Sequence, residues 1–197
     1  MKHAIYNRRS IRKYLNKPVS KELIAEMIDA GRVAPSAKNR QPWRYVVLSG
    51  ESKAEFLECM QKGIAREENE QSFLPESKSG IPDAKHTWGI MVEAPILIVI
   101  LNTNGTSPFI EISADDRITE ICDTLSIGAS IENMLLKATE LGLGTLWIAN
   151  TCFAYKELTA YLNTTQQLVG AIALGYADEN PAPRPRKSNE DIVEYRL

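Results

Sequence analysis

The residues best suited to chemistry form a basic cluster near the amino end, with the sequence Arg8-Arg9-Ser10-Ile11-Arg12. Three guanidinium groups and a hydroxyl lie within these five residues, with no acidic residue beside them. Guanidinium groups hold phosphates through bidentate, charge-assisted hydrogen bonds, so a phosphate ligand is the first hypothesis. A solvated basic face and a nucleic-acid arm remain alternatives, because runs of charge are common at protein surfaces.

A second basic cluster, Arg184-Pro185-Arg186-Lys187, lies close to the carboxyl end. The chain as a whole has a formal net charge of -2. Beyond these two clusters there is no basic stripe of the kind that nucleic-acid binders use. Local basicity against an acidic background favours a small anionic ligand, and no nucleic-acid partner is expected.

Composition places the chain among ordinary globular proteins, with 197 residues, 44% of them hydrophobic and 24% charged. This length suits one domain with one sizeable core. No apolar run reaches the roughly 18 residues of a membrane span, and no apolar signal region follows the basic start. We therefore expect a cytoplasmic protein without a membrane partner. Three widely spaced cysteines and two histidines predict a reducing compartment and no metal site.

Hydrophobic periodicity predicts the elements that must position the two clusters. Ile96 to Leu101 is an unbroken apolar run, typical of a central strand covered on both faces, so helices are expected on both sides of the sheet. Helices are predicted at residues 3–9, from Ser20 to just before Pro35, and at 51–66, 114–141 and 154–162. Strands are predicted at 45–48, 96–101, 145–149 and 168–174, with an added edge strand at 192–195 in a carboxyl-terminal arm, residues 178–197.

The longest periodic segment begins with Ser113-Ala114-Asp115-Asp116, which has the form of a capping box. About 27 residues at about 1.5 Å each give a helix of roughly 40 Å, longer than a sheet of one domain needs beneath it. Small residues in mid-helix, between Ser126 and Ser130, permit the close approach of another helix. We therefore expect that a second copy of the chain packs on the part of this helix that extends beyond the sheet, and that the protein is a homodimer.

Two irregular segments are candidates for ligand contact. Residues 35–43, with two prolines and several polar side chains, form either an ordinary connector or a binding loop, and their position directly before a strand favours the loop. Residues 67–90 are predicted to be irregular, as a mobile flap over a ligand site or as an uninvolved surface excursion. Trp88 in this stretch is a possible substrate-pocket residue, whereas Trp43, Trp147 and Cys122 are expected to pack and His86 to lie on the surface.

Four motifs now stand in order along the chain: Arg-Arg-Ser-x-Arg, Pro-Ser-x-x-Asn-x-Gln-Pro-Trp, Gly-Leu-Gly before a strand containing Trp, and Arg-Pro-Arg-Lys. In that order and over nearly the whole length, the chain resembles the FMN-dependent nitroreductase family. The resemblance implies one domain over residues 1–197, with an α+β fold, a central mixed or antiparallel sheet flanked by helices on both faces, and a long central helix at a dimer interface. It also implies one FMN per site, contacted by both subunits.

The resemblance assigns cofactor contacts to three parts of the chain. Arg8, Ser10 and Arg12, with Arg9 among them, match the positions that hold the FMN phosphate and ribityl chain, and Arg184 and Arg186 match phosphate contacts near the carboxyl end. Pro35, Ser36, Ala37 and Asn39, with Gln41 nearby, match a loop that lies along the flavin ring from the other subunit. Ile148, Ala149 and Asn150 match a strand end whose backbone faces the reactive nitrogen of the ring.

The chain departs from the family at residues 87–91, which lack the Asn and Lys that contact the polar edge of the flavin in well-studied members. The implied function is an oxidoreductase in which NAD(P)H reduces FMN and the flavin then reduces a small electron acceptor, such as a nitroaromatic or quinone, by a ping-pong mechanism. The cofactor carries such chemistry, so no catalytic side chain is expected. The alternatives are a flavin-binding storage or redox-sensing protein without turnover, and a family variant that acts as a dehalogenase.

Overall fold

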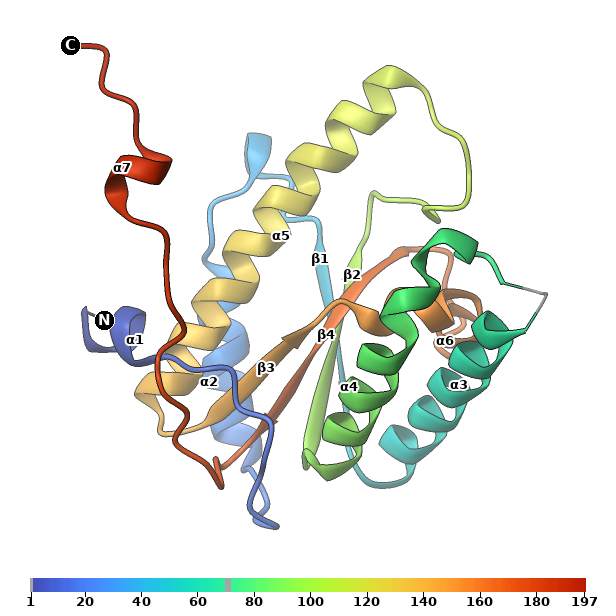
Figure 1. The fold of residues 1–197 in the computed structure, drawn as a ribbon, viewed down its shortest axis with the longest axis horizontal. Coiled ribbons are helices and arrows are strands. Elements are labelled where there is room, and N and C mark those ends of the chain that lie inside the picture. Colours follow the sequence, from blue (N-terminus) through green and yellow to red (C-terminus); the bar gives the residue numbers. More distant parts are fainter. Residues whose placement is uncertain (1, 70–71) are drawn as a thin grey trace.

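The fold is built on an antiparallel sheet, described in a computed structural model that covers residues 2–69 and 72–197 (Figure 1). Its four strands lie in the order β1-β2-β4-β3, and every neighbouring pair is antiparallel. Their bounds are Trp43–Leu48 for β1, Ile96–Asn102 for β2, Gly144–Ile148 for β3 and Gln167–Gly175 for β4. The strands predicted at 45–48, 96–101, 145–149 and 168–174 agree with these bounds to within two residues.

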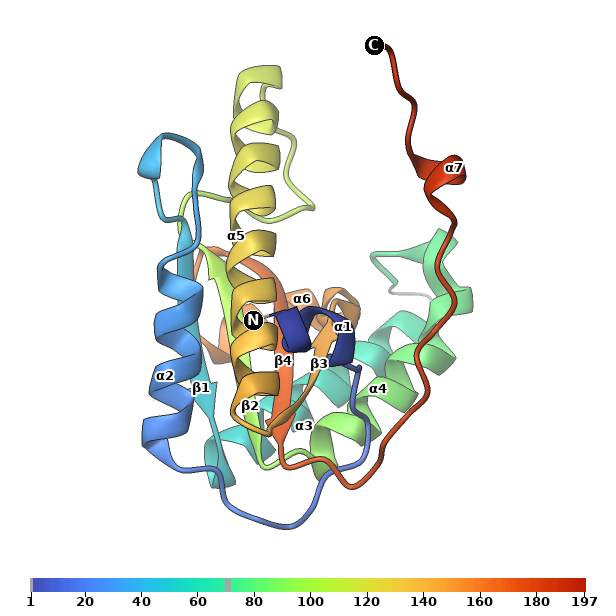
Figure 2. The same ribbon diagram turned by 90° about the vertical axis from the view of Figure 1, so that its left-hand side faces the viewer.

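Strand β2 separates two hydrophobic cores and is buried along its whole length. Ile96, Ile98 and Ile100 pack on the face covered by α2 (Lys21–Arg32) and α5 (Ala114–Glu140). Their neighbours Leu97, Val99 and Leu101 point to the opposite face, because successive side chains of a strand alternate. That face is covered by α3 (Gly50–Glu68), α4 (Ile81–Glu93) and α6 (Tyr155–Tyr161) (Figures 1 and 2). The prediction of helices on both faces is confirmed.

The two helices on the first face begin where their capping residues predict. The Oγ of Ser20 accepts a hydrogen bond from the Leu23 amide at 3.4 Å, and the Oγ of Ser113 accepts one from the Asp116 amide at 3.1 Å. A Cβ on Gly31 would lie 2.7 Å from the Cγ of Met134, so this glycine lets α2 approach α5 closely. Ile118, Ile121 and Leu125 on the first half of α5 are more than half exposed.

The prediction of irregular structure over residues 67–90 is wrong for much of that stretch. Helix α3 continues to Glu68, a 3₁₀ turn, η2, spans Pro75–Gly80, and α4 begins at Ile81 with Pro82 in its first turn, where proline is tolerated. The turn after α3 is organised by the buried Glu67 carboxylate, which accepts hydrogen bonds from the Ser72 hydroxyl and from the amides of Phe73 and Leu74. Residues 70 and 71 of the predicted flap lie outside the described residues, and its role stays a prediction.

The two ends of the chain meet beside the exposed edge of β3. A short helix α1 (Lys2–Asn7) leads into a segment in which the Ile11 amide donates to the Thr145 carbonyl at 2.9 Å. The Leu15 amide donates to the Tyr176 carbonyl and the Asp178 amide to the Lys13 carbonyl, both at 2.9 Å. The amino-terminal segment is thereby held between β3 and the start of the carboxyl-terminal arm.

The carboxyl-terminal arm then projects away from the sheet (Figures 1 and 2). The predicted edge strand at 192–195 is wrong, because Ile192 ends a short helix, α7 (Asn189–Ile192), that begins with a capping box between Ser188 and Asp191. Ile192, Tyr195 and Leu197 are exposed on this arm. Over residues 2–69 and 72–197, no helix combines the length and apolar character needed to span a bilayer.

Candidate functional site

Both basic clusters line one cavity of about 360 Å³, here called the arginine cavity. Its amino-terminal wall contains all four of the predicted phosphate ligands from that end of the chain, and its other wall is the start of the carboxyl-terminal arm. The lining residues are Ile5, Tyr6, Arg8, Arg9, Ser10, Arg12, Pro181, Ala182, Pro183, Arg184 and Arg186. Groups more than 170 positions apart in the sequence therefore share one site.

Backbone pairing beside β3 brings the two clusters together. Ser10 forms a parallel bridge with Thr145, and Tyr14 forms an antiparallel bridge with Ala177. The Arg12 amide donates to the carboxylate of Glu179, which joins the first cluster directly to the arm. Burial raises the pKa of Tyr14, as does the Glu179 charge, while Arg12 opposes them. The Tyr14 hydroxyl thus stays protonated and donates to the Ile11 carbonyl at 2.8 Å.

The arginines keep most of their hydrogen-bond capacity for a ligand. Arg9 Nη1 donates to the Tyr6 carbonyl at 2.7 Å, Arg12 Nη1 donates to the Ser10 carbonyl at 3.2 Å, and Arg186 Nη1 donates to the Arg184 carbonyl at 3.2 Å. A guanidinium group has five N–H donors, so these local bonds leave several unused on each side chain. Arg8 forms an ion pair with Glu132 on α5, with 3.5 Å between Nε and Oε1. With arginines outnumbering carboxylates around it, the cavity suits a multiply charged anion.

A second cavity of about 190 Å³, here called the strand-end cavity, adjoins the first because Arg12 lines both. Ile148, Ala149 and Asn150 lie together in its wall, where β3 ends and a 3₁₀ turn, η3 (Asn150–Ala154), begins. The other lining residues are Arg12, Asp83, His86, Thr87, Ile90, Leu146 and Trp147. The structure thus places the predicted phosphate ligands and the predicted strand end in two neighbouring cavities that share Arg12.

Helix α4 supplies residues to this site that the sequence analysis missed. Asp83, His86, Thr87 and Ile90 have the spacing of one helix face, and that face forms a wall of the strand-end cavity. His86 is exposed, as expected of a surface residue, yet it lies at this wall. The helical spacing of these four residues could have identified them from the sequence. The prediction of irregular structure over residues 67–90 left this spacing unused. Trp147, expected to pack, is 46% exposed beside the same cavity.

The loop at residues 35–41 lies elsewhere in the same chain. Its 3₁₀ turn, η1 (Ala37–Asn39), stands on the opposite side of α5 from α1 and the arm (Figure 2). The Ala37 amide donates to Ser126 Oγ at 3.2 Å, and Arg40 forms an ion pair at 2.7 Å with the buried Asp123. One chain does not bring Pro35, Ser36, Ala37, Asn39 and Gln41 into the arginine or strand-end cavity. Their predicted contact with a cofactor from a second subunit stays a prediction.

Three non-glycine residues of this loop have left-handed backbone conformations. Lys38 and Asn39 have φ of 54° and Gln41 has φ of 48°, in the left-handed region that costs non-glycine residues free energy. The Gln41 amide donates to Ser36 Oγ at 3.0 Å, which stabilises the turn.

Trp88 lies on α4, and its indole donates to the Leu57 carbonyl of α3 at 2.9 Å. It lines neither the arginine cavity nor the strand-end cavity, but it lines a separate cavity of about 350 Å³ between α3 and α4, so a role in substrate binding stays a prediction.

Comparisons with known proteins identify the family of the chain. The model of the nitroreductase family matches residues 5–176. A 4-nitrobenzoate reductase of Pseudomonas putida is 28% identical, over 89% of this chain and 85% of its own length. A BluB-like flavoprotein from Clostridium difficile 630 has a TM-score of 0.82 at 25% identity, covering 100% of this chain and 98% of its own. The FMN-dependent nitroreductase NfnB from Mycobacterium smegmatis, solved with NADPH, has a TM-score of 0.76 at 19% identity, covering 100% and 97%. The chain belongs to the nitroreductase family.

Proposed function

We propose that this protein is an FMN-dependent oxidoreductase that uses NAD(P)H to reduce an electron-poor small molecule, such as a nitroaromatic or a quinone. The observation that carries the proposal is the meeting of the two basic clusters in one cavity, directly beside the end of β3. Neither cluster alone distinguishes a phosphate site from a solvated surface. Their convergence provides arginines from both ends of the chain for one anion.

The residues present fit FMN in both chemistry and arrangement. Arg8, Arg12, Arg184 and Arg186 would hold the phosphate, with Ser10 as a further donor, because all of them line the arginine cavity. Arg12 also lines the strand-end cavity, where apolar Leu146 and Ile90 would lie against a flat ring system. A phosphate at one end and an uncharged ring at the other match the two adjoining cavities. The named relatives include a flavoprotein and an FMN-dependent enzyme.

Bound FMN would supply the redox chemistry, accepting a hydride from NAD(P)H and passing electrons to the acceptor in a ping-pong cycle. The chain itself binds the phosphate, orients the ring and provides fixed dipoles. We assign the contact with the reactive ring nitrogen to the backbone N–H of Ala149, because this residue follows β3 at the cavity wall. An amide dipole can stabilise one redox state without gaining or losing a proton.

The site is proposed to be completed by a second copy of the chain. Ile118, Ile121 and Leu125 lie on one side of α5 and are exposed, although their chemistry favours burial. A partner that packs on this face could bring its own residues 35–41 to the cofactor, which one chain cannot do. We therefore propose a homodimer with two shared sites.

Anaerobic reduction of the purified, FMN-loaded protein tests the function. Bleaching of the oxidised flavin absorbance by NADH or NADPH, followed by reoxidation with a nitroaromatic or quinone, is the expected result. A flavin that only dithionite reduces would support the alternative of a flavin-storage or redox-sensing protein. An acceptor panel that includes halogenated aromatics distinguishes the dehalogenase alternative, since halide release would then accompany flavin oxidation.

A further inference from the structure

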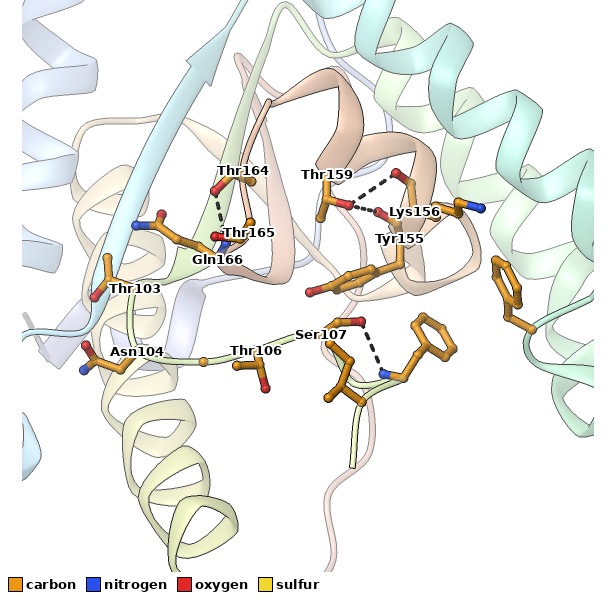
Figure 3. Close-up of a pocket in the computed structure, with 14 residues that line it drawn as sticks. Thr103, Asn104, Thr106, Ser107, Tyr155, Lys156, Thr159, Thr164, Thr165 and Gln166 are labelled. Carbon is orange, nitrogen blue, oxygen red and sulfur yellow. Dashed lines mark hydrogen bonds between the residues drawn. The ribbon is translucent and has the colours of Figure 1, made fainter. Parts of the chain in front are cut away.

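A cavity of about 610 Å³, larger than the arginine and strand-end cavities, has no role in the proposed function (Figure 3). It lies between the segment that follows β2, helix α6 with the loop after it, and Phe73 beyond α3. None of its described lining residues also lines the arginine or strand-end cavity. Those residues are Phe73, Thr103, Asn104, Gly105, Thr106, Ser107, Phe109, Ile110, Tyr155, Lys156, Thr159, Thr164, Thr165 and Gln166.

Three aromatic rings form one wall of this cavity. The ring centres of Phe73 and Phe109 are 5.6 Å apart, and those of Phe109 and Tyr155 are 5.7 Å apart with the rings nearly perpendicular. Phe73 and Phe109 are each 44% exposed, so their apolar area is incompletely buried in the chain. Aromatic rings at these distances attract a further ring in offset or edge geometry. The wall therefore favours an aromatic ligand.

The rest of the lining is polar but almost uncharged. Of the described residues that line the cavity, only Lys156 carries a charge, and its amino group is turned away from the cavity centre (Figure 3). That nitrogen lies 5.7 Å from the centre of the Phe73 ring. The Tyr155 hydroxyl points into the cavity and accepts a hydrogen bond from the Leu168 amide at 3.3 Å, so its own O–H remains available as a donor (Figure 3). Burial raises the pKa of Tyr155. Such a lining suits a neutral ligand with a hydroxyl or carbonyl substituent.

The polar wall is held in place by contacts with the body of the protein. Asn104 Nδ2 donates to Oδ2 of the buried Asp123 at 3.1 Å, and Thr103 Oγ1 donates to the Pro42 carbonyl at 3.2 Å. A Cβ on Gly105 would lie 2.3 Å from Gln167 Oε1, so the backbone packs closely here. Binding cavities are usually formed before the ligand arrives, and these contacts give this one a defined shape.

The volume sets the size of the ligand. A cavity of about 150 Å³ in a protein core accepts benzene, and this one is several times larger. We propose that it is a second ligand site, separate from the cofactor site, which binds a neutral aromatic compound of two or three fused rings. The ligand lies against Phe109 and Tyr155 and exchanges hydrogen bonds with the polar wall.

Binding of 2-naphthol to the full-length, FMN-loaded protein tests this proposal. The compound is a neutral, hydroxylated two-ring aromatic and does not accept electrons from the flavin, so the test is independent of turnover. Equilibrium dialysis is expected to show saturable binding of one molecule per chain. Phe109→Ala removes the middle ring of the wall and should weaken binding about tenfold.

Two substitutions at one position provide a matched pair. The Thr159 hydroxyl is turned back onto α6, donating to the Tyr155 carbonyl at 2.8 Å and to the Lys156 carbonyl at 3.2 Å, so the rest of the side chain faces the cavity. Thr159→Trp fills the cavity and should abolish naphthol binding, whereas Thr159→Ala removes the same hydroxyl, keeps the space and should retain binding. Thermal melting of each variant checks that the fold persists.

The result that overturns the proposal is equally concrete. If Thr159→Trp and Phe109→Ala bind naphthol as tightly as the parent protein, the compound binds elsewhere. Absence of saturable binding up to the solubility limit also rejects the site. Arg186→Gln separates the two proposals, because it should weaken FMN binding and leave naphthol binding within about twofold.

Discussion

The side-chain amide of Asn150, directly after β3, donates a hydrogen bond of 2.8 Å to the carboxylate of Asp83 on α4. The same nitrogen lies 3.0 Å from the Thr87 hydroxyl, so the strand end is tied to two turns of one helix. Both partners line the strand-end cavity. The amide nitrogen of Asn150 is thereby engaged with the protein, which supports our proposal that the backbone N–H of Ala149 contacts the ring.

The first prediction separates the roles of these two neighbours. Asn150→Ala should leave the rate of flavin reduction largely intact, because the Asn150 amide nitrogen donates to Asp83 and Thr87 and is not the proposed donor to the ring. Ala149→Pro removes the backbone N–H and requires φ near −65°, whereas Ala149 has φ of −104°. It should slow reduction by NAD(P)H or shift the midpoint potential in protein that retains FMN. Stopped-flow reduction and redox titration of both variants provide the measurement. A large loss of rate in Asn150→Ala with an unchanged Ala149→Pro would assign the role to a side chain.

The second prediction concerns cofactor retention. Arg186→Gln or Arg12→Gln should weaken FMN binding about 10- to 150-fold, because a hydrogen bond to a charged group contributes about 1.5–3 kcal/mol. Riboflavin, which lacks the phosphate, should bind the parent protein far more weakly than FMN. Fluorescence titration of the apoprotein measures both. Arg32→Gln is the control, because Arg32 pairs with Asp29 on the surface of α2 and should not affect FMN. Equal affinities for FMN and riboflavin would contradict the phosphate assignment.

The third prediction tests the shared site. A Cβ on Gly128 meets only Trp147, at 3.9 Å, so a larger side chain there fits the single chain. Gly128→Leu should therefore fold but hinder the packing of a second subunit on α5, reducing dimer and FMN content together. Gly128→Ala is the matched control, since it adds only a methyl group and improves helix propensity by about 1 kcal/mol. Size-exclusion chromatography with light scattering measures the assembly. A stable monomer that still holds FMN would sink this idea.

The fourth prediction links pH to the stability of the turn after α3. Burial alone would raise the pKa of Glu67, but hydrogen bonds from Ser72, Arg66 and the Leu74 and Phe73 amides outweigh it and lower the pKa. A carboxyl with a lowered pKa in the folded state contributes stability above its unfolded pKa, about 4.3, and loses it as pH falls through the folded value. Stability should therefore decline from about pH 5 downward.

Glu67→Gln should destabilise the protein at pH 7 by about 1–3 kcal/mol, because it weakens several hydrogen bonds around a buried group. The variant should also lose less stability than the parent on acidification from pH 7 to pH 4. Urea unfolding at both pH values measures this. Glu68→Gln is the control, because Glu68 pairs with Lys85 at the surface and should change stability by less than about 0.5 kcal/mol. Identical pH dependence in Glu67→Gln and the parent would show that Glu67 does not titrate with unfolding.

Most of the helices and strands, and the chemistry of the two arginine clusters, could be predicted from the amino-acid sequence. Local patterns carry this information. A capping residue followed by apolar residues at helical spacing predicts a helix whatever the rest of the chain packs against, as at Ser20 and Ser113. The apolar run of β2 likewise indicated burial on both faces. Arginines in two short clusters indicated an anion site because guanidinium chemistry does not depend on the fold.

Which distant residues meet could not be predicted from local patterns, because it depends on how the whole chain folds. Arg12 and Arg186 share a cavity because Ile11 pairs with Thr145 and Lys13 with Asp178, contacts between segments that no local pattern connects. Asp83 and Thr87 line the strand-end cavity because α4 packs on the sheet. The buried Glu67 carboxylate stabilises a turn that the composition of the segment had marked as irregular. Long-range pairing and burial depend on the whole chain at once, whereas periodicity and capping act over a few residues.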